Sequence, residues 1–135
     1  MRAAGVEAGF DAAAMLATQP PVRGGRGVVV TTVGGWGVVA ADAIERSAHL
    51  RLDPLPGDLS AAIDELLPPR WSRNNPIDLA GGATRDTRPS VLELVAPHPP
   101  TDAVLLLRLG IQSNQAALMG SGGFYPAPGL DRLVE

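Results

Sequence analysis

The sequence contains no cysteine and no lysine. Without cysteine, the chain can form no disulfide, no thiolate nucleophile and no cysteine-based metal site. Because all 11 of its basic residues are arginine, it also lacks a P-loop lysine, a Schiff-base lysine and a lysine general base. Histidine is nearly as scarce, since only His49 and His98 could supply an imidazole ligand. A bound catalytic transition metal is therefore not expected.

Long apolar runs and a strong excess of one charge are missing too. Glu7 and Asp11 interrupt the start of the chain, which argues against a secretory signal. The longest uncharged stretch, Leu109 to Leu130, is broken by polar residues, glycine and proline, and falls short of the roughly 20 apolar residues of a spanning helix. The net charge of −3 does not favour nucleic acid or an anionic membrane. We therefore expect a cytoplasmic protein that binds neither.

Glycine and proline are abundant instead, with 16 and 13 residues in a chain of 135, a length that suits one domain. They separate apolar segments that alternate between strand-like and helix-like patterns. This alternation, with short connections, is typical of an α/β fold with an open parallel sheet and helices on both faces. The expected helices are 10–17, 38–48, 59–67 with Asp58 as N-cap, and one from Asp86 or Thr87 to Ala96, and the expected strands are 28–33, 49–52 and 103–107.

Two of the expected strands have the composition of deeply buried strands. Residues 28–33 are mostly β-branched without polar alternation, as in a central parallel strand that is covered on both faces. Residues 103–107 form the second strongly buried strand, whereas 76–79 is too short to assign. After Gly110 the pattern weakens, so we expect the sheet to be incomplete toward the carboxyl end.

The segment Gly34-Gly35-Trp36-Gly37 follows the first buried strand and precedes a helix. At the carboxyl edge of a parallel sheet, glycines let the backbone approach a ligand, and a helix start offers N–H groups and partial positive charge. Thr31 or Thr32 could add a hydroxyl donor. A phosphate or a phosphorylated side chain is the natural ligand for such a site, and the alternative is that the glycines only form a tight turn.

A second glycine-marked loop runs from Asn75 to Ala83. Asp78 is its one charged group, followed by Gly81 and Gly82. The carboxylate could anchor neighbouring loop amides or a ligand hydroxyl, and it could equally cap a turn through its own backbone.

Taken together, these segments resemble the NDP-forming acyl-CoA synthetases related to succinyl-CoA synthetase. The resemblance covers about Phe10 to Leu107. It rests on a series of short motifs in the family's order. These are Gln19-Pro20, Thr31-Thr32-Val33-Gly34-Gly35-Trp36-Gly37 with Asp42, Leu67-Pro68-Pro69, Asn75-Pro76-Ile77-Asp78-Leu79, and Gly81-Gly82-Ala83.

The resemblance implies a flavodoxin-like ligase domain at 27–110, preceded by an N-terminal helix and linker at 1–26 and followed by a loop-rich tail at 111–135. In the family, the glycine loop at the helix start receives a phosphorylated histidine from another domain. In this sequence, the resemblance assigns the docking of the phosphorylated histidine to Thr32, Gly34, Gly35 and Gly37. It assigns a supporting loop to Asn75, Asp78, Gly81 and Gly82.

No catalytic residue is expected on this chain, because the family's phosphohistidine stands in a Ser-His-Thr-Gly context that the sequence lacks. Its role is not transferred to His49 or His98, which are expected to be surface or cap residues. The resemblance implies that the whole enzyme converts an acid, CoA and ATP, with Mg²⁺, into acyl-CoA, ADP and phosphate. Neither CoA nor nucleotide is expected to bind to this chain alone.

The partners implied by the resemblance are a CoA-binding domain that carries the phosphohistidine and an ATP-grasp domain. The open sheet edge could also form an oligomer. Two positions depart from the family, since Thr32 replaces asparagine and Trp36 replaces a small residue or proline. They leave open a non-catalytic regulatory or scaffolding module, as in synthetase-like regions fused to protein acetyltransferases. A free-standing flavodoxin-like small-molecule binder is a third hypothesis.

Overall fold

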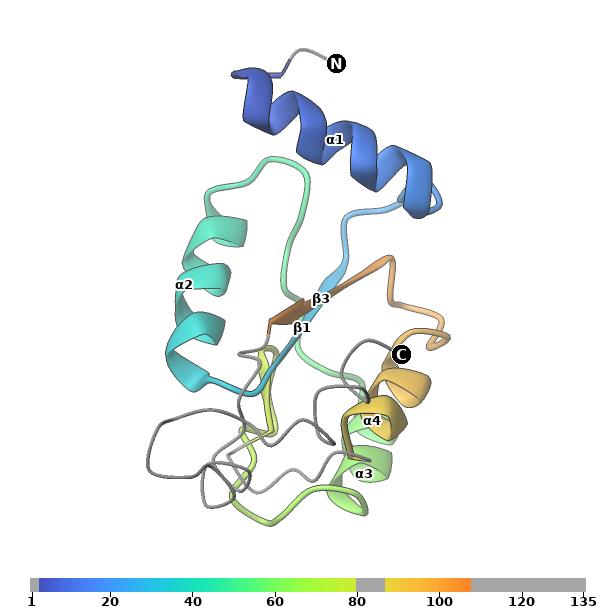
Figure 1. Ribbon diagram of the computed structural model, residues 1–135. Coiled ribbons are helices and arrows are strands. Elements are labelled where there is room, and N and C mark those ends of the chain that lie inside the picture. Colours follow the sequence, from blue (N-terminus) through green and yellow to red (C-terminus); the bar gives the residue numbers. More distant parts are fainter. Residues whose placement is uncertain (1–2, 80–86, 108–135) are drawn as a thin grey trace, which may run out of the picture.

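The computed structural model describes residues 3–79 and 87–107, and Figure 1 shows how their helices and strands are arranged. Helices and strands alternate along most of the chain, as the sequence predicts. Their bounds are α1 Val6–Thr18, β1 Gly27–Thr31, α2 Gly34–Glu45, α3 Gly57–Asp64, β2 Ile77–Asp78, α4 Thr87–Val95 and β3 Ala103–Leu107.

The strands form a three-stranded parallel sheet in the order β2-β1-β3. Val30 of β1 is aligned with Ile77 of β2 on one side and with Leu106 of β3 on the other. Helix α2 lies on one face of this sheet, and α3 and α4 lie together on the other face (Figure 1). The α/β fold class and the helices on both faces are therefore confirmed.

The hydrophobic core lies between the sheet and the pair α3 and α4. Every residue of β1 is buried, which confirms the prediction of a central strand. Because side chains alternate along a strand, Val28 and Val30 enter this core while Thr31 faces α2. The core cluster consists of Val28, Val30, Leu59, Ile63, Leu67, Trp71, Ile77, Leu79, Val91 and Val95.

Strand β3 is less buried than the sequence predicts. It occupies the predicted residues, yet none of them is fully buried and the side chain of Leu106 is 41% exposed. The reason is its place in the sheet, since among the described strands β3 pairs only with β1. An apolar run shows that a strand is suited to burial, and the neighbours decide whether it is buried.

Helix α1 begins earlier than predicted and stands away from the sheet (Figure 1). Although the helix is rich in apolar residues, none of them is buried, and Val6 and Phe10 are 79% and 72% exposed. None of the helices in the described ranges is both long and apolar enough to cross a membrane.

Three local predictions were wrong. Residues 49–52 form no strand, because only Arg51 makes an isolated parallel bridge, to Arg26. Asp58 is not the N-cap of α3, since that helix already begins at Gly57 after Pro56 and has no side-chain cap. Helix α2 begins at Gly34 rather than at residue 38, so the predicted glycine loop is the first turn of the helix. The expectations about 108–135 lie outside the described residues.

Candidate functional site

The start of α2 is held in place by a compact turn at the end of β1. The hydroxyl of the buried Thr31 accepts a hydrogen bond from the Val33 N–H at 3.0 Å and donates one to the Val33 carbonyl at 2.8 Å. The same carbonyl then accepts the N–H groups of Trp36 at 3.0 Å and Gly37 at 3.3 Å. Val33 thereby becomes the N-cap residue, and α2 starts directly at the carboxyl edge of the sheet.

The first two residues of α2 keep their N–H groups available. Within the described part of the chain, neither Gly34 nor Gly35 donates a backbone hydrogen bond to any acceptor. Apart from its neighbours in the turn, no atom of the described residues lies within 4 Å of the position that a Cβ on Gly35 would take, so none of these residues closes this side of the turn. Unbonded N–H groups at a helix start, next to the positive end of its dipole, form a site suited to an anion.

Gly34 and Gly37 contact the rest of the domain. A Cβ on Gly34 would lie 2.7 Å from Oδ2 of Asp78, so glycine allows this carboxylate to approach the helix start. A Cβ on Gly37 would lie 3.1 Å from Cγ2 of Thr31 and 3.4 Å from Cβ of Pro76, so glycine allows α2 to pack closely on the sheet. Of the three predicted glycines, only Gly35 therefore borders open space.

Thr32 continues the pairing of β1, because its N–H donates to the carbonyl of Leu107 at 3.2 Å. Its hydroxyl is buried and has no hydrogen-bond partner among the described residues. The role of Thr32 as a donor to phosphate remains a prediction.

The supporting loop divides into two parts with different surroundings. Asp78 lies beside the start of α2, as described above, and its own N–H donates to the Ser72 hydroxyl at 3.1 Å. Asn75 is buried and bonds to backbone groups at the other end of β1, donating to the Gly27 carbonyl at 2.8 Å. Asn75 therefore stabilises the sheet through hydrogen bonds to the backbone of β1. Gly81 and Gly82 lie outside the described residues.

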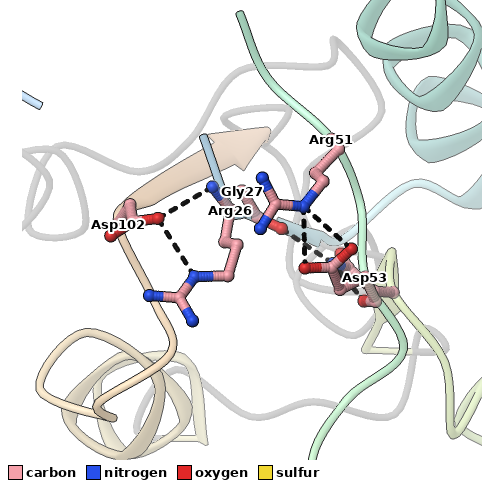
Figure 2. A network of polar contacts seen from close by, with 6 residues as sticks. Arg26, Gly27, Arg51, Asp53 and Asp102 are labelled. Carbon is pink, nitrogen blue, oxygen red and sulfur yellow. Dashed lines mark hydrogen bonds and ion pairs between the residues drawn. The ribbon is translucent and has the colours of Figure 1, made fainter. Parts of the chain in front are cut away.

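A polar network occupies the opposite, amino edge of the sheet (Figure 2). Oδ2 of Asp102 accepts the backbone N–H of Arg26 at 2.9 Å and its Nε at 3.2 Å. These hydrogen bonds, together with the charge of the guanidinium, lower the pKa of Asp102. Beside this pair, Nε of Arg51 donates to both carboxylate oxygens of Asp53 at 3.0 and 3.2 Å. The network joins the starts of β1 and β3 and leaves the carboxyl edge free of these charges.

The two histidines do not contact the start of α2. His49 is exposed. Nε2 of His98 lies 3.3 Å from Oδ2 of Asp58, where α3 begins. The Leu59 backbone N–H and then His98 lower the pKa of Asp58. Across the described residues, no three histidine or acidic side chains are grouped closely enough to hold a metal ion.

Trp71 combines burial in the core with a polar contact that no local sequence pattern indicates. This residue is 3% exposed and belongs to the core, while its indole Nε1 donates to Oδ1 of Asp64 at 2.7 Å. Trp36, by contrast, is 55% exposed on the first turn of α2. Trp71 therefore packs within the domain, whereas Trp36 faces solvent.

Comparison with known proteins identifies the family. The family model of the ligase-CoA domain matches residues 27–112. The chain belongs to the ligase-CoA family. This ligase-CoA chain is 31% identical over 96 residues to the 4-hydroxybutyrate–CoA ligase (ADP-forming) of Nitrosopumilus maritimus, covering 71% of the chain and 14% of that protein. It is also 31% identical over 107 residues to subunit alpha of the acetate–CoA ligase (ADP-forming) I of Pyrococcus furiosus, covering 79% of the chain and 23% of the subunit.

Solved structures agree with this assignment. The ligase-CoA chain superposes on the dinucleotide-forming acetyl-coenzyme A synthetase 1 of Ca. Korarchaeum cryptofilum, in its apo form, with a TM-score of 0.72 and 32% identity. The match covers 78% of this chain and 23% of the synthetase, which has also been solved in complex with phosphate and ADP. The resemblance to ADP-forming acyl-CoA synthetases is thus confirmed. The chain spans only 14% to 23% of the length of these relatives.

Proposed function

We propose that the chain works as the ligase-CoA domain of an ADP-forming acyl-CoA synthetase and that the start of α2 receives a phosphorylated histidine from another domain. The observation that carries this proposal is the first turn of α2, where the N–H groups of Gly34 and Gly35 have no acceptor among the described residues and Gly35 borders open space. A phosphoryl group fits these donors and the positive end of the helix dipole.

The chemistry assigned to this chain is electrostatic. Backbone N–H groups that are fixed before the reaction stabilise negative charge on a transferring phosphoryl group without having to reorganise. The Thr31 turn keeps α2 from shifting, because it ties Val33 to the end of β1 through two hydrogen bonds. The hydroxyl of Thr32 supplies a further donor in this proposal.

The whole synthetase would use CoA, ATP and Mg²⁺, and we assign their binding to a CoA-binding domain that carries the histidine and to an ATP-grasp domain. The described residues would contact only the phosphoryl group, through the N–H groups of Gly34 and Gly35 and the hydroxyl of Thr32. Asp78 would set the limit of the site, since its carboxylate lies against Gly34 and repels an anion that moves too far toward β2.

The proposal is tested by combining this chain with the CoA-binding and ATP-grasp domains and measuring thioester formation that depends on acid, CoA and ATP. Replacing Gly35 by leucine fills the open side of the turn, and we expect the rate to fall by about 10²-fold, the typical effect of losing a preorganised donor. Gly57→Leu is the matched control, because Gly57 also begins a helix and has open space at its Cβ position.

An unchanged rate for Gly35→Leu, in an assembly that forms thioester, would contradict docking at α2. An intact assembly that forms no thioester at all would instead support the non-catalytic scaffolding module.

A further inference from the structure

A single hydroxyl closes the loop that leads into β2. The side chain of Ser72 donates a hydrogen bond to the Pro76 carbonyl at 2.8 Å and accepts one from the backbone N–H of Asp78 at 3.1 Å. The Asn74 carbonyl lies farther from the hydroxyl, at 3.4 Å. Ser72 is exposed, so water could bond to its hydroxyl as well as the loop does. The effect of the two hydrogen bonds is therefore to fix the shape of the loop.

Both residues that Ser72 holds lie against the first turn of α2. A Cβ on Gly37 would meet Cβ of Pro76 at 3.4 Å, and a Cβ on Gly34 would meet Oδ2 of Asp78 at 2.7 Å. A change in the shape of this loop would therefore move a proline ring and a carboxylate relative to the backbone donors of α2.

The neighbours of Ser72 in the sequence fix it to the core. Trp71 is buried, and its Nε1 donates to Oδ1 of Asp64 in α3 at 2.7 Å. The guanidinium of Arg73 lies 2.8 Å from the same oxygen and donates to the Pro69 carbonyl at 2.7 Å. Arg73 has a φ of 45°, which residues other than glycine keep only where their surroundings hold them. The backbone at Ser72 is thus fixed from both sides.

A carboxylate beside the start of α2 has to stay at a set distance. The side chain of aspartate is itself a good partner for the free N–H groups of a helix start. If Asp78 moved toward Gly34, it would compete with a phosphoryl group for the same donors and repel it more strongly. The hydrogen bond from the Asp78 N–H to Ser72 holds the backbone of Asp78 and restricts this movement.

We propose that Ser72 is a positioning residue, which holds the Asp78 carboxylate beside the start of α2 and keeps it from occupying the N–H groups of Gly34 and Gly35. This inference rests on the proposed function, because it concerns the phosphoryl group that the same site receives. Loss of the Ser72 hydroxyl should slow turnover without weakening the binding of CoA, which we assign to another domain.

The test measures thioester formation by the assembled synthetase. Ser72→Ala should lower kcat about tenfold, the order of one lost positioning hydrogen bond. The KM for CoA should stay within about twofold, since CoA does not contact this loop in the proposal. Ser72→Thr keeps the hydroxyl and should hold kcat within about twofold of the unchanged chain.

Ser47→Ala is the matched control. The hydroxyl of Ser47 also accepts a backbone N–H, from His49 at 3.1 Å, but it lies beyond the other end of α2. This substitution removes the same kind of hydrogen bond and should leave kcat unchanged. Urea unfolding should give Ser72→Ala and Ser47→Ala similar midpoints.

A double-mutant cycle with Asp78→Asn shows whether Ser72 acts through the carboxylate. An amide competes with a phosphoryl group less than a carboxylate does, so Ser72→Ala should change kcat by less than about twofold in the Asp78→Asn background. An equal loss of kcat in both backgrounds would show a merely structural role and overturn the proposal. An unchanged kcat for Ser72→Ala, or a loss that Ser72→Thr shares, would also overturn it.

Gly35→Leu in the same assay separates this inference from the proposed function. If Gly35→Leu slows thioester formation and Ser72→Ala does not, docking at α2 stands and only the role of Ser72 is refuted. If Gly35→Leu has no effect, docking at α2 is refuted and the role of Ser72 with it.

Discussion

Asn75 provides the sharpest test of how this small sheet is held together. Strand β2 pairs with β1 only at Val30 and Thr31, so the first half of β1 has no strand on that side among the described residues. The side chain of Asn75 takes that place. It accepts the Val29 N–H at 3.0 Å and donates to the carbonyls of Gly27 at 2.8 Å and Asp53 at 3.1 Å.

Replacing Asn75 by alanine removes all three hydrogen bonds and leaves Val29 N–H and the Gly27 carbonyl unpaired in a buried strand. Each buried unpaired group costs about 1–3 kcal/mol. Partial access of water to the vacated space lowers this cost, so we expect a loss of about 3 kcal/mol in the free energy of unfolding. That loss is a large part of the 5–15 kcal/mol that is typical of a domain.

Urea unfolding followed by circular dichroism measures this loss, and the midpoint should fall by about 2 M for a typical slope of about 1.5 kcal/mol per M. Asn74→Ala is the matched control, because Asn74 is the exposed neighbour and its side chain makes no hydrogen bond within the described residues. If Asn75→Ala lost less than about 0.5 kcal/mol, or no more than the control, the buried amide would not be supporting β1.

Three further substitutions test other parts of the fold. Trp71→Ala should cost about 3–5 kcal/mol in urea unfolding, because it opens a cavity in the core, and a cost under about 1 kcal/mol would contradict its burial. Gly37→Val should cost about 1–3 kcal/mol through overpacking against β1, whereas Gly35→Val should be nearly neutral in the same measurement. Since the pKa of Asp102 lies below its ordinary 3.8 in the folded chain, its contribution should be complete above that pH and lost as the pH falls through the lowered pKa. Asp102→Asn should flatten this acid-side loss in unfolding curves measured from pH 2 to 6, and an unchanged slope would argue against the Arg26 contact.

The central strand was predictable from the sequence because its composition and its environment agree. Residues 28–31 are β-branched without polar alternation, and β1 lies in the middle of the sheet with both faces covered. Residues 103–107 are just as apolar, yet β3 has one described neighbour and remains partly exposed. Burial of a strand depends on its place in the sheet, and local composition carries no information about that place.

The start of α2 was misplaced for a different reason. Glycine is a poor helix former, so 34–37 has the composition of a loop. In the structure the helix begins there because the Val33 carbonyl accepts hydrogen bonds from two N–H groups of the first turn. The Thr31 hydroxyl in turn holds Val33 through two hydrogen bonds. These glycines are required by contacts rather than by flexibility, since Gly34 allows the approach of Asp78 and Gly37 that of β1.

The role of Asn75 could not be predicted, because its partners lie 46 and 48 residues away on β1. No pattern in the local sequence distinguishes an asparagine that binds a ligand from one that replaces a missing strand. The segment 75–79, which is part of the family resemblance, thus contains residues with different roles. Asn75 supports the sheet, whereas Asp78 borders the start of α2.

The two edges of the sheet differ in a way that bears on where a ligand can bind. At the amino edge, Oδ2 of Asp102 accepts two hydrogen bonds from Arg26, and the Asn75 side chain bonds to the first residues of β1, so these groups already have partners within the domain. At the carboxyl edge, the N–H groups of Gly34 and Gly35 have none among the described residues. Unpaired donors at a helix start are satisfied by water or by a ligand. Within the described residues, the carboxyl edge is therefore the one whose backbone donors remain available to a ligand.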